Sequence, residues 1–233
     1  MAMYWTNSQS IAKPIHQDDT GPVGPVFLNM PHLIRLLTVL TVLLGMPALA
    51  HPGASSAIDH YSHEIEESPQ DQSHYIRRGI AYSNDGQYDK ALADFEQAKS
   101  LGEPIVVSFD LGVLHYRRGE FATARAYFDE YLEAFPNHAA CLEYRARLKR
   151  DMGDTNGAVA DFQRVFDLQQ RPNPGHYISV AGMLEPTEPD GMGRALEVLD
   201  EGNAKLGLTP QLQQHAIQLE LRRGRTDLAI ARM

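Results

Sequence analysis

A helix-breaking glycine returns at a nearly constant interval, and this period constrains the fold more than any other feature of the sequence. Gly86, Gly119 and Gly153 are separated by 33 and 34 residues. Each glycine stands between two segments whose apolar residues recur at helical spacing. Because glycine ends a helix and permits a tight turn, each of them predicts the turn of a helical hairpin.

Small and large apolar residues keep the same interval after each turn. Alanines recur at offsets of 33, 34, 37 and 34 residues, and a large apolar residue follows each of the first four alanines by four positions. The alanines are Ala91, Ala124, Ala158, Ala195 and Ala229, and the large residues are Phe95, Phe128, Phe162 and Leu199. A unit that repeats in this way cannot bury its apolar face alone, so neighbouring units stack. We therefore expect the alanines to be buried where two helices cross.

The segment from Gln72 to Pro104 carries the whole pattern and resembles the tetratricopeptide repeat (TPR). The order is aromatic, Gly and Tyr on a first helix, then Ala, Phe and Ala on a second, then Pro: Tyr75, Gly79, Tyr82, Ala91, Phe95, Ala98 and Pro104. The departures are small. Tyr75 stands where the family prefers Trp, Arg78 stands where it prefers Leu, and Pro104 comes one residue late.

The resemblance covers about residues 56–233 and implies an all-α, right-handed solenoid of antiparallel helical hairpins. The expected repeats span residues 72–104, 105–137, 138–171, 175–208 and 209–233. Residues 51–71 are expected to form a linker and a capping helix, because the end of a solenoid needs a cover. Ser55 is the predicted N-cap of that helix, which would run to about Glu67.

The last repeat leaves room for only a short second helix, over about residues 226–233. Leu228, Ala229 and Ile230 give this helix an apolar face, and no further helix follows to cover it. Short helices are marginal without tertiary packing. We therefore predict that this end frays or pairs with another chain.

The N-terminal residues predict export. Residues 1–29 are rich in Pro and Gly, and we expect them to be disordered or to precede the true start at Met30. Residues 30–50 combine Arg35, a short apolar run and the small-residue site Ala48-Leu49-Ala50, the pattern of a secretory signal peptide. Cleavage after Ala50 predicts a periplasmic or secreted protein, exported across a bacterial-type inner membrane. The run is shorter than the ~20 residues of a membrane span, so none is expected to remain after cleavage.

Charge and composition narrow the functional classes. The net charge is −9, and an acidic chain without a basic block does not suit nucleic acid, whose binding depends on neutralised phosphates. The single Cys141 forms no internal disulfide or cysteine-based zinc site, and we expect it to be buried. No catalytic motif is present, so we predict no enzymatic activity and no cofactor.

One feature, a set of histidines, leaves metal binding open as an interpretation. His51, at the expected mature N-terminus, and His60 and His63 on the capping helix offer imidazoles that copper or zinc favour. The alternative function is therefore a periplasmic metal-handling or enzyme-accessory protein. The acidic loop Glu185–Gly191 matches no calcium motif, and we interpret it as a surface loop.

The resemblance implies that the first helices of the repeats line a groove that binds a protein or peptide. The groove candidates are Arg77, Ile80, Asn84, Phe109, Asp110, Val113, Tyr116, Tyr144 and Arg147. Some of these side chains could instead pack between neighbouring helices. Chaperone-binding members of the family clamp a C-terminal carboxylate, but the matching positions here hold Ile76, Ile80, Asp110, Ala140 and Tyr144. The clamp is absent, and the sequence names neither the partner nor the oligomeric state.

Overall fold

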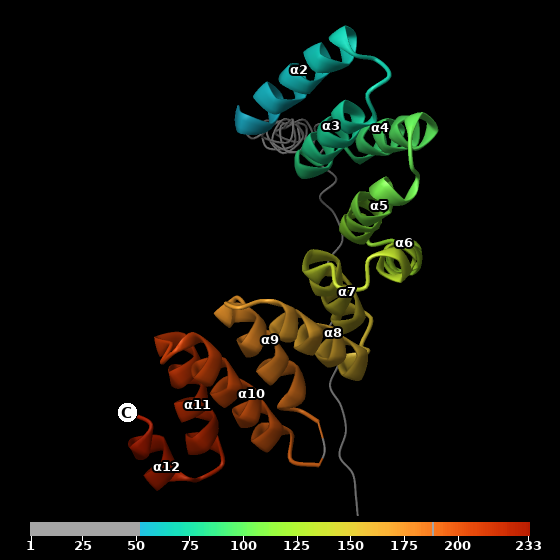
Figure 1. Ribbon diagram of the computed structural model, residues 1–233. Coiled ribbons are helices and arrows are strands. Elements are labelled where there is room, and N and C mark those ends of the chain that lie inside the picture. Colours follow the sequence, from blue (N-terminus) through green and yellow to red (C-terminus); the bar gives the residue numbers. More distant parts are fainter. Residues whose placement is uncertain (1–51, 188) are drawn as a thin grey trace, which may run out of the picture. The chain divides into compact units, whose positions relative to one another are not determined.

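The computed structural model describes residues 52–187 and 189–233. The chain divides into two units, Met1–Leu49 and Ala50–Met233, and the structure concerns the second. The predicted N-terminal extension, the signal peptide and His51 lie outside the described residues. Within residues 52–187 and 189–233 the regular secondary structure is helical throughout (Figure 1). The predicted all-α fold of helical hairpins is confirmed.

The helices follow one another as five hairpins after a single leading helix. That helix is α2 (Pro52–Glu67), and the hairpins are α3 (Gln72–Asn84) with α4 (Tyr88–Leu101), α5 (Ile105–Arg117) with α6 (Phe121–Ala134), α7 (Ala139–Asp151) with α8 (Thr155–Leu168), α9 (Pro174–Leu184) with α10 (Gly191–Leu206), and α11 (Pro210–Arg222) with α12 (Thr226–Ala231). Each hairpin packs on the next along the chain, and α5 also contacts α3 and α7. The helix α9 begins one residue before the predicted start of its repeat.

The predicted glycine turns have the backbone conformation that requires glycine. Gly86, Gly119 and Gly153 have φ angles of 78°, 74° and 83°, in the left-handed region. Gly224 takes the same conformation between α11 and α12, with a φ of 72°. Any other residue would be strained there, so the repeating glycine is a requirement of the turn.

The predicted helix crossings are also confirmed. Ala91, Ala124 and Ala158 are completely buried. On the facing helix, a Cβ added at Gly79 would lie 2.7 Å from the ring of Phe95. The same addition at Gly112 would meet Phe128 at 2.5 Å, so small residues allow the two helices of a hairpin to approach around one aromatic ring.

Buried ion pairs link the helices of the first and third hairpins. In the first, the Arg78 guanidinium donates to both carboxylate oxygens of Asp94, at 2.8 and 2.7 Å. At the matching positions of the third, Arg145 donates to both oxygens of Asp161, at 2.9 and 2.8 Å. Lys149, which stands where Tyr is usual, lies 2.7 Å from the Asp161 carboxylate. These pairs explain why Arg78 replaces the apolar residue that the resemblance leads one to expect.

At the same two positions the second hairpin has an apolar and an aromatic residue in place of the ion pair. Leu111 is completely buried, and Tyr127 packs on the same core cluster. The Tyr127 ring stacks on His115 with the ring centroids 5.4 Å apart. One fold therefore accepts either an ion pair or apolar packing at this point.

The leading helix packs on α3, but its predicted cap is wrong. The helix α2 begins at Pro52, so Ser55 lies inside it and is not the N-cap. Ala57, Tyr61 and Ile65, spaced by four residues along this helix, are half-buried. The Ser62 hydroxyl accepts a hydrogen bond from Arg78, 3.2 Å away, and this joins α2 to the first buried ion pair.

The last helix is short but has polar contacts with its neighbours. Arg232 donates to both oxygens of Asp200 on α10, at 2.5 and 2.8 Å. The Gln213 side chain on α11 donates to the Arg232 carbonyl, at 2.7 Å. Leu228 and Ile230 nevertheless remain 47% and 60% exposed. The predicted fraying or pairing of this end stays a prediction.

The loop between α9 and α10 is connected to the last hairpin by two of its acids. Glu185 pairs with Arg222, and Asp190 lies 3.1 Å from Arg223. Asp190 also caps α10 by accepting from the Gly193 amide. These carboxylates therefore have structural partners.

No helix within residues 52–187 or 189–233 has the length and apolar character that crossing a bilayer requires.

Candidate functional site

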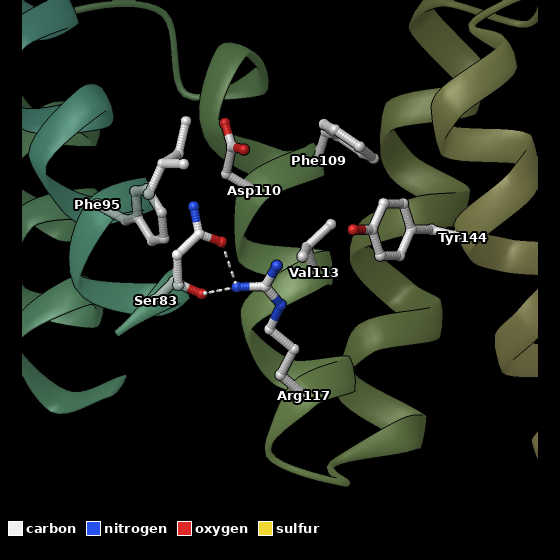
Figure 2. Close-up of a pocket in the computed structure, with 9 residues that line it drawn as sticks. Ser83, Phe95, Phe109, Asp110, Val113, Arg117 and Tyr144 are labelled. Atoms are coloured by element: carbon white, nitrogen blue, oxygen red, sulfur yellow. Dashed lines mark hydrogen bonds between the residues drawn. The ribbon is translucent and has the colours of Figure 1, made fainter. Parts of the chain in front are cut away.

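A hollow of about 180 Å³ lies among the first helices of the first three hairpins (Figure 2). We call it the first hollow. Its lining comes from α3, α4, α5 and α7: Ile80, Ser83, Asn84, Phe95, Phe109, Asp110, Val113, Arg117 and Tyr144. The lining combines aromatic and aliphatic walls with a few polar groups, which is the usual character of a binding site.

One face of α5 provides the floor of the first hollow. Asp110, Val113 and Arg117 are spaced by three and four residues, which places them on the same side of a helix. Figure 2 shows Asp110 and Arg117 toward opposite ends of the hollow with Val113 between them. A rise of 1.5 Å per residue separates the two backbone positions by about 10 Å. The two residues are therefore attached at different ends of this helix face, and the Arg117 side chain reaches back toward Val113 (Figure 2).

Arg117 is held by neutral oxygens of α3. Its guanidinium donates to the Ser83 hydroxyl at 3.1 Å and to the Asn84 side-chain carbonyl at 2.7 Å (Figure 2). These bonds position the guanidinium without neutralising it. This end of the hollow therefore carries positive charge.

Asp110 has no such partner. Among the described residues, no basic side chain pairs with its carboxylate, and burial alone raises its pKa to about 6. Burial disfavours the charged form because the carboxylate loses water without gaining a counter-charge. The other end of the hollow therefore holds an acid that lacks an internal partner.

Aromatic rings fix the wall between α5 and α7. Phe109 meets Tyr144 edge to face, with ring centroids 5.7 Å apart, and lies 6.3 Å from the core ring of Phe128. Edge contacts of this kind add stabilisation beyond the buried area. The wall is therefore connected to the core.

A second hollow of about 420 Å³ lies further along, among α5, α7, α8 and α9, and we call it the second hollow. Its lining residues are Tyr116, Arg147, Arg150, Phe162, Asn173, Gly175, His176 and Ser179. It adjoins the first hollow through an edge-to-face contact between Tyr116 and Tyr144, with ring centroids 6.2 Å apart.

Most polar groups of the second hollow are already engaged. The Tyr116 hydroxyl donates to Asp151 at 2.6 Å, and burial with this hydrogen bond raises the Tyr116 pKa to about 12. Arg147 pairs with Glu143, which also lies 3.2 Å from His176. Burial lowers the pKa of His176. Since these charges satisfy one another, the first hollow is the stronger candidate site.

The structure brings together most of the residues that the sequence singled out. Six of the nine candidates line the first hollow, and Tyr116 and Arg147 line the second. Arg77 is exposed and lines neither. Ser83, Phe95 and Arg117 were missed, although the spacing of Arg117 from Asp110 and Val113 signals the same helix face.

The other candidate residues have structural contacts. Cys141 is buried as predicted, and burial raises its pKa to about 12, so its thiol is unreactive. His60 and His63 lie 3.4 and 3.5 Å from carboxylates one turn along α2. Within the part of the chain that the structure describes, no three His, Cys, Asp or Glu side chains are grouped so that they could hold a metal ion.

Comparison with known proteins agrees with the architecture. The family model described as tetratricopeptide repeat matches residues 76–139. The photosystem I assembly protein Ycf3 of Synechococcus sp. (strain CC9605) is 28% identical over 127 residues. That alignment covers 48% of this chain and 73% of Ycf3.

Solved structures show the same fold. The TPR protein YrrB, whose structure is described as having an unusual peptide-binding site, superposes with a TM-score of 0.58 at 15% identity, over 76% of this chain and 90% of YrrB. Yeast Tom70 superposes with a TM-score of 0.56 at 22% identity, over 75% of this chain and 37% of Tom70. The chain thus spans about a third of Tom70. The described residues therefore have the fold of a TPR solenoid.

Proposed function

We propose that this chain is a non-catalytic scaffold that binds a protein or peptide in the first hollow. The observation that carries this proposal is the lining: rigid aromatic rings beside two opposite charges, neither of which has an ionic partner within the hollow. Aromatic and Arg side chains are frequent anchors of protein interfaces. An extended segment along α3, α5 and α7 would reach all of them.

Distant relatives support a role in assembly. Ycf3 of Synechococcus is named as a photosystem I assembly protein, and YrrB is described as having an unusual peptide-binding site. We extend only the general idea to this chain, which would hold a partner while a larger complex forms.

We also propose that the scaffold works after export, in the periplasm or outside the cell. The support is the pattern of residues 30–50, with cleavage after Ala50. N-terminal sequencing of the mature protein from its native host is expected to read His-Pro-Gly. An exported protein that begins within residues 1–29 would contradict this localisation signal.

Site-specific photocrosslinking tests the binding role. We would place p-benzoylphenylalanine at position 144, inside the first hollow, and separately at position 168. Leu168 is the matched control, because it is 40% exposed on α8 and lines neither hollow. Irradiation of intact cells is expected to join a protein to position 144.

The outcome depends on the contrast between the two positions. A discrete adduct at position 144 that is absent at position 168, and that is identified by mass spectrometry, would support binding in the hollow. Equal adducts at both positions, or adducts only at position 168, would contradict it.

A further inference from the structure

We propose that the first hollow selects a basic side chain, lysine or arginine, from the segment it binds, with Asp110 as the counter-charge. This inference rests on the proposed function and specifies the chemistry of the partner at that same site. The inference follows from Asp110, the charged residue of the hollow that has no ionic partner among the described residues.

Two other carboxylates of this chain have an arginine partner, whereas Asp110 does not. Asp94 and Asp161, both almost fully buried, each accept two hydrogen bonds from an arginine. Asp110 lies in a hollow without a basic partner among the described residues. A carboxylate that loses water without compensation destabilises the folded state. A cation supplied by a partner would remove this cost at the moment of binding.

The walls suit the rest of such a side chain. Lysine and arginine carry aliphatic stems that pack along apolar surface while the charged end reaches a polar group. Phe109 and Val113 lie beside Asp110 on the lining, and Tyr144 faces them from α7 (Figure 2). Aromatic faces also attract cations directly. The hollow therefore offers both a surface for the stem and a charge for its end.

Arg117 sets the orientation. Its backbone lies about 10 Å along α5 from that of Asp110, and its guanidinium is fixed by Ser83 and Asn84. A basic residue at the Arg117 end would meet a like charge. The bound segment is therefore expected to place its basic residue at the Asp110 end.

The test uses synthetic peptides of three matched versions. Each is an N-acetylated, C-amidated octapeptide with leucine and phenylalanine around one central position, which holds lysine, norleucine or glutamate. An array that varies the order of the flanking residues identifies the lysine peptide that binds best. Fluorescence polarisation then measures the affinities of its three versions at about pH 7.5, where free carboxylates are ionised.

Wild type, Asp110→Asn and Asp110→Lys are compared with Asp167→Asn. Asp167 is exposed on α8 and lines neither hollow, so its variant controls for the loss of one negative charge. We expect norleucine for lysine, or Asn for Asp110, to weaken binding about 10-fold or more, since a charge-assisted hydrogen bond is lost. The Asp110→Lys variant is expected to prefer the glutamate peptide. Asp167→Asn is expected to bind as wild type does.

The outcomes distinguish a failure of the charge selection from a failure of the proposed peptide binding. If the three peptides bind wild type equally, and Tyr144→Ala weakens all of them, the hollow binds peptides but the charge selection is wrong. If no version binds up to about 1 mM, both the inference and peptide binding by this hollow are overturned. Circular dichroism of each variant confirms that it is folded before its affinity is interpreted.

Discussion

A carboxylate inside the first hairpin is paired with an arginine, whereas the carboxylate in the first hollow has no ionic partner among the described residues. Inside the first hairpin, Asp94 is closed off from water and is held by Arg78. In the hollow, Asp110 has neither full solvation nor a partner among the described residues. Internal pairing satisfies the first acid as soon as the chain folds, whereas the second stays available to another molecule. The difference separates a residue that builds the repeat from one that we assign to binding.

The largest expected effect comes from breaking a buried pair. Arg78→Leu leaves Asp94 buried without its counter-charge and should lower the free energy of unfolding by about 3 kcal/mol or more. Arg145→Leu should cost less, because Lys149 still contacts Asp161 at 2.7 Å. Urea denaturation of both variants measures the difference. Equal losses would mean that Lys149 provides no compensation.

The second hairpin supplies the control for that experiment. The double variant Arg78→Leu/Asp94→Tyr copies the Leu111 and Tyr127 pair into the first hairpin. Replacing a whole buried ion pair by apolar residues is often neutral or stabilising. The double variant is therefore expected to regain most of the lost stability. A loss as large as that of Arg78→Leu would show that the two hairpins are not interchangeable at this point.

An intermediate effect is expected at the helix crossings. Ala124 is completely buried where α6 packs on α5. Ala124→Leu overpacks this crossing and should cost about 1–3 kcal/mol. Thermal unfolding by circular dichroism provides the measurement, with Ala122→Leu as the control because Ala122 is exposed on the same helix. An unchanged melting temperature for Ala124→Leu would count against this packing.

The smallest effect is expected at the C-terminal helix. Asp200→Ala removes the pair with Arg232 at a side chain that is 49% exposed, and Arg232 keeps its contact with the buried Glu220, so the global loss should stay below about 1 kcal/mol. Local opening is more sensitive, and hydrogen exchange of residues 226–233 should accelerate in the variant. In wild type these residues should already exchange faster than residues 88–134. Strong protection of this helix in a proven monomer would contradict the predicted fraying.

The sequence predicted the repeat better than the contacts within it. The spacing of glycines and alanines fixes turns and crossings because each depends on one residue's own geometry, such as the positive φ of Gly86. The Arg78–Asp94 pair was missed because it joins two helices, although the same 16-residue separation returns in Arg145 and Asp161. The start of α2 was also misjudged, since Ser55 gives a local cap signal that the longer helix overrides.

The candidate site was predictable as a helix face but not as a pair of charges. The resemblance to the TPR family placed Asp110 and Val113 on the same groove in advance. Which carboxylate finds a partner depends on side chains from other helices, and the spacing within one helix does not contain that information. The bonds from Arg117 to Ser83 and Asn84 illustrate this, because they cross from α5 to α3.

The unpaired Asp110 carboxylate makes the stability of the folded state depend on pH. Burial raises the pKa of Asp110 in the folded state to about 6, above its ordinary value of 3.8. Between these values the folded state keeps a proton that the unfolded state has released, so this group makes stability fall as pH rises. The cost is fully present above about pH 6 and absent below about pH 3.8.

The most direct test of this account is the difference in unfolding free energy between Asp110→Asn and wild type, measured from low to neutral pH. At about pH 7.5 the variant is expected to be more stable by about 1–3 kcal/mol, because asparagine removes an unpaired charge. The advantage should decrease through the window around pH 4–6 and disappear once Asp110 is protonated in both states. A variant that is less stable than wild type at neutral pH would contradict the account, since Asp110 would then have an internal partner that it loses.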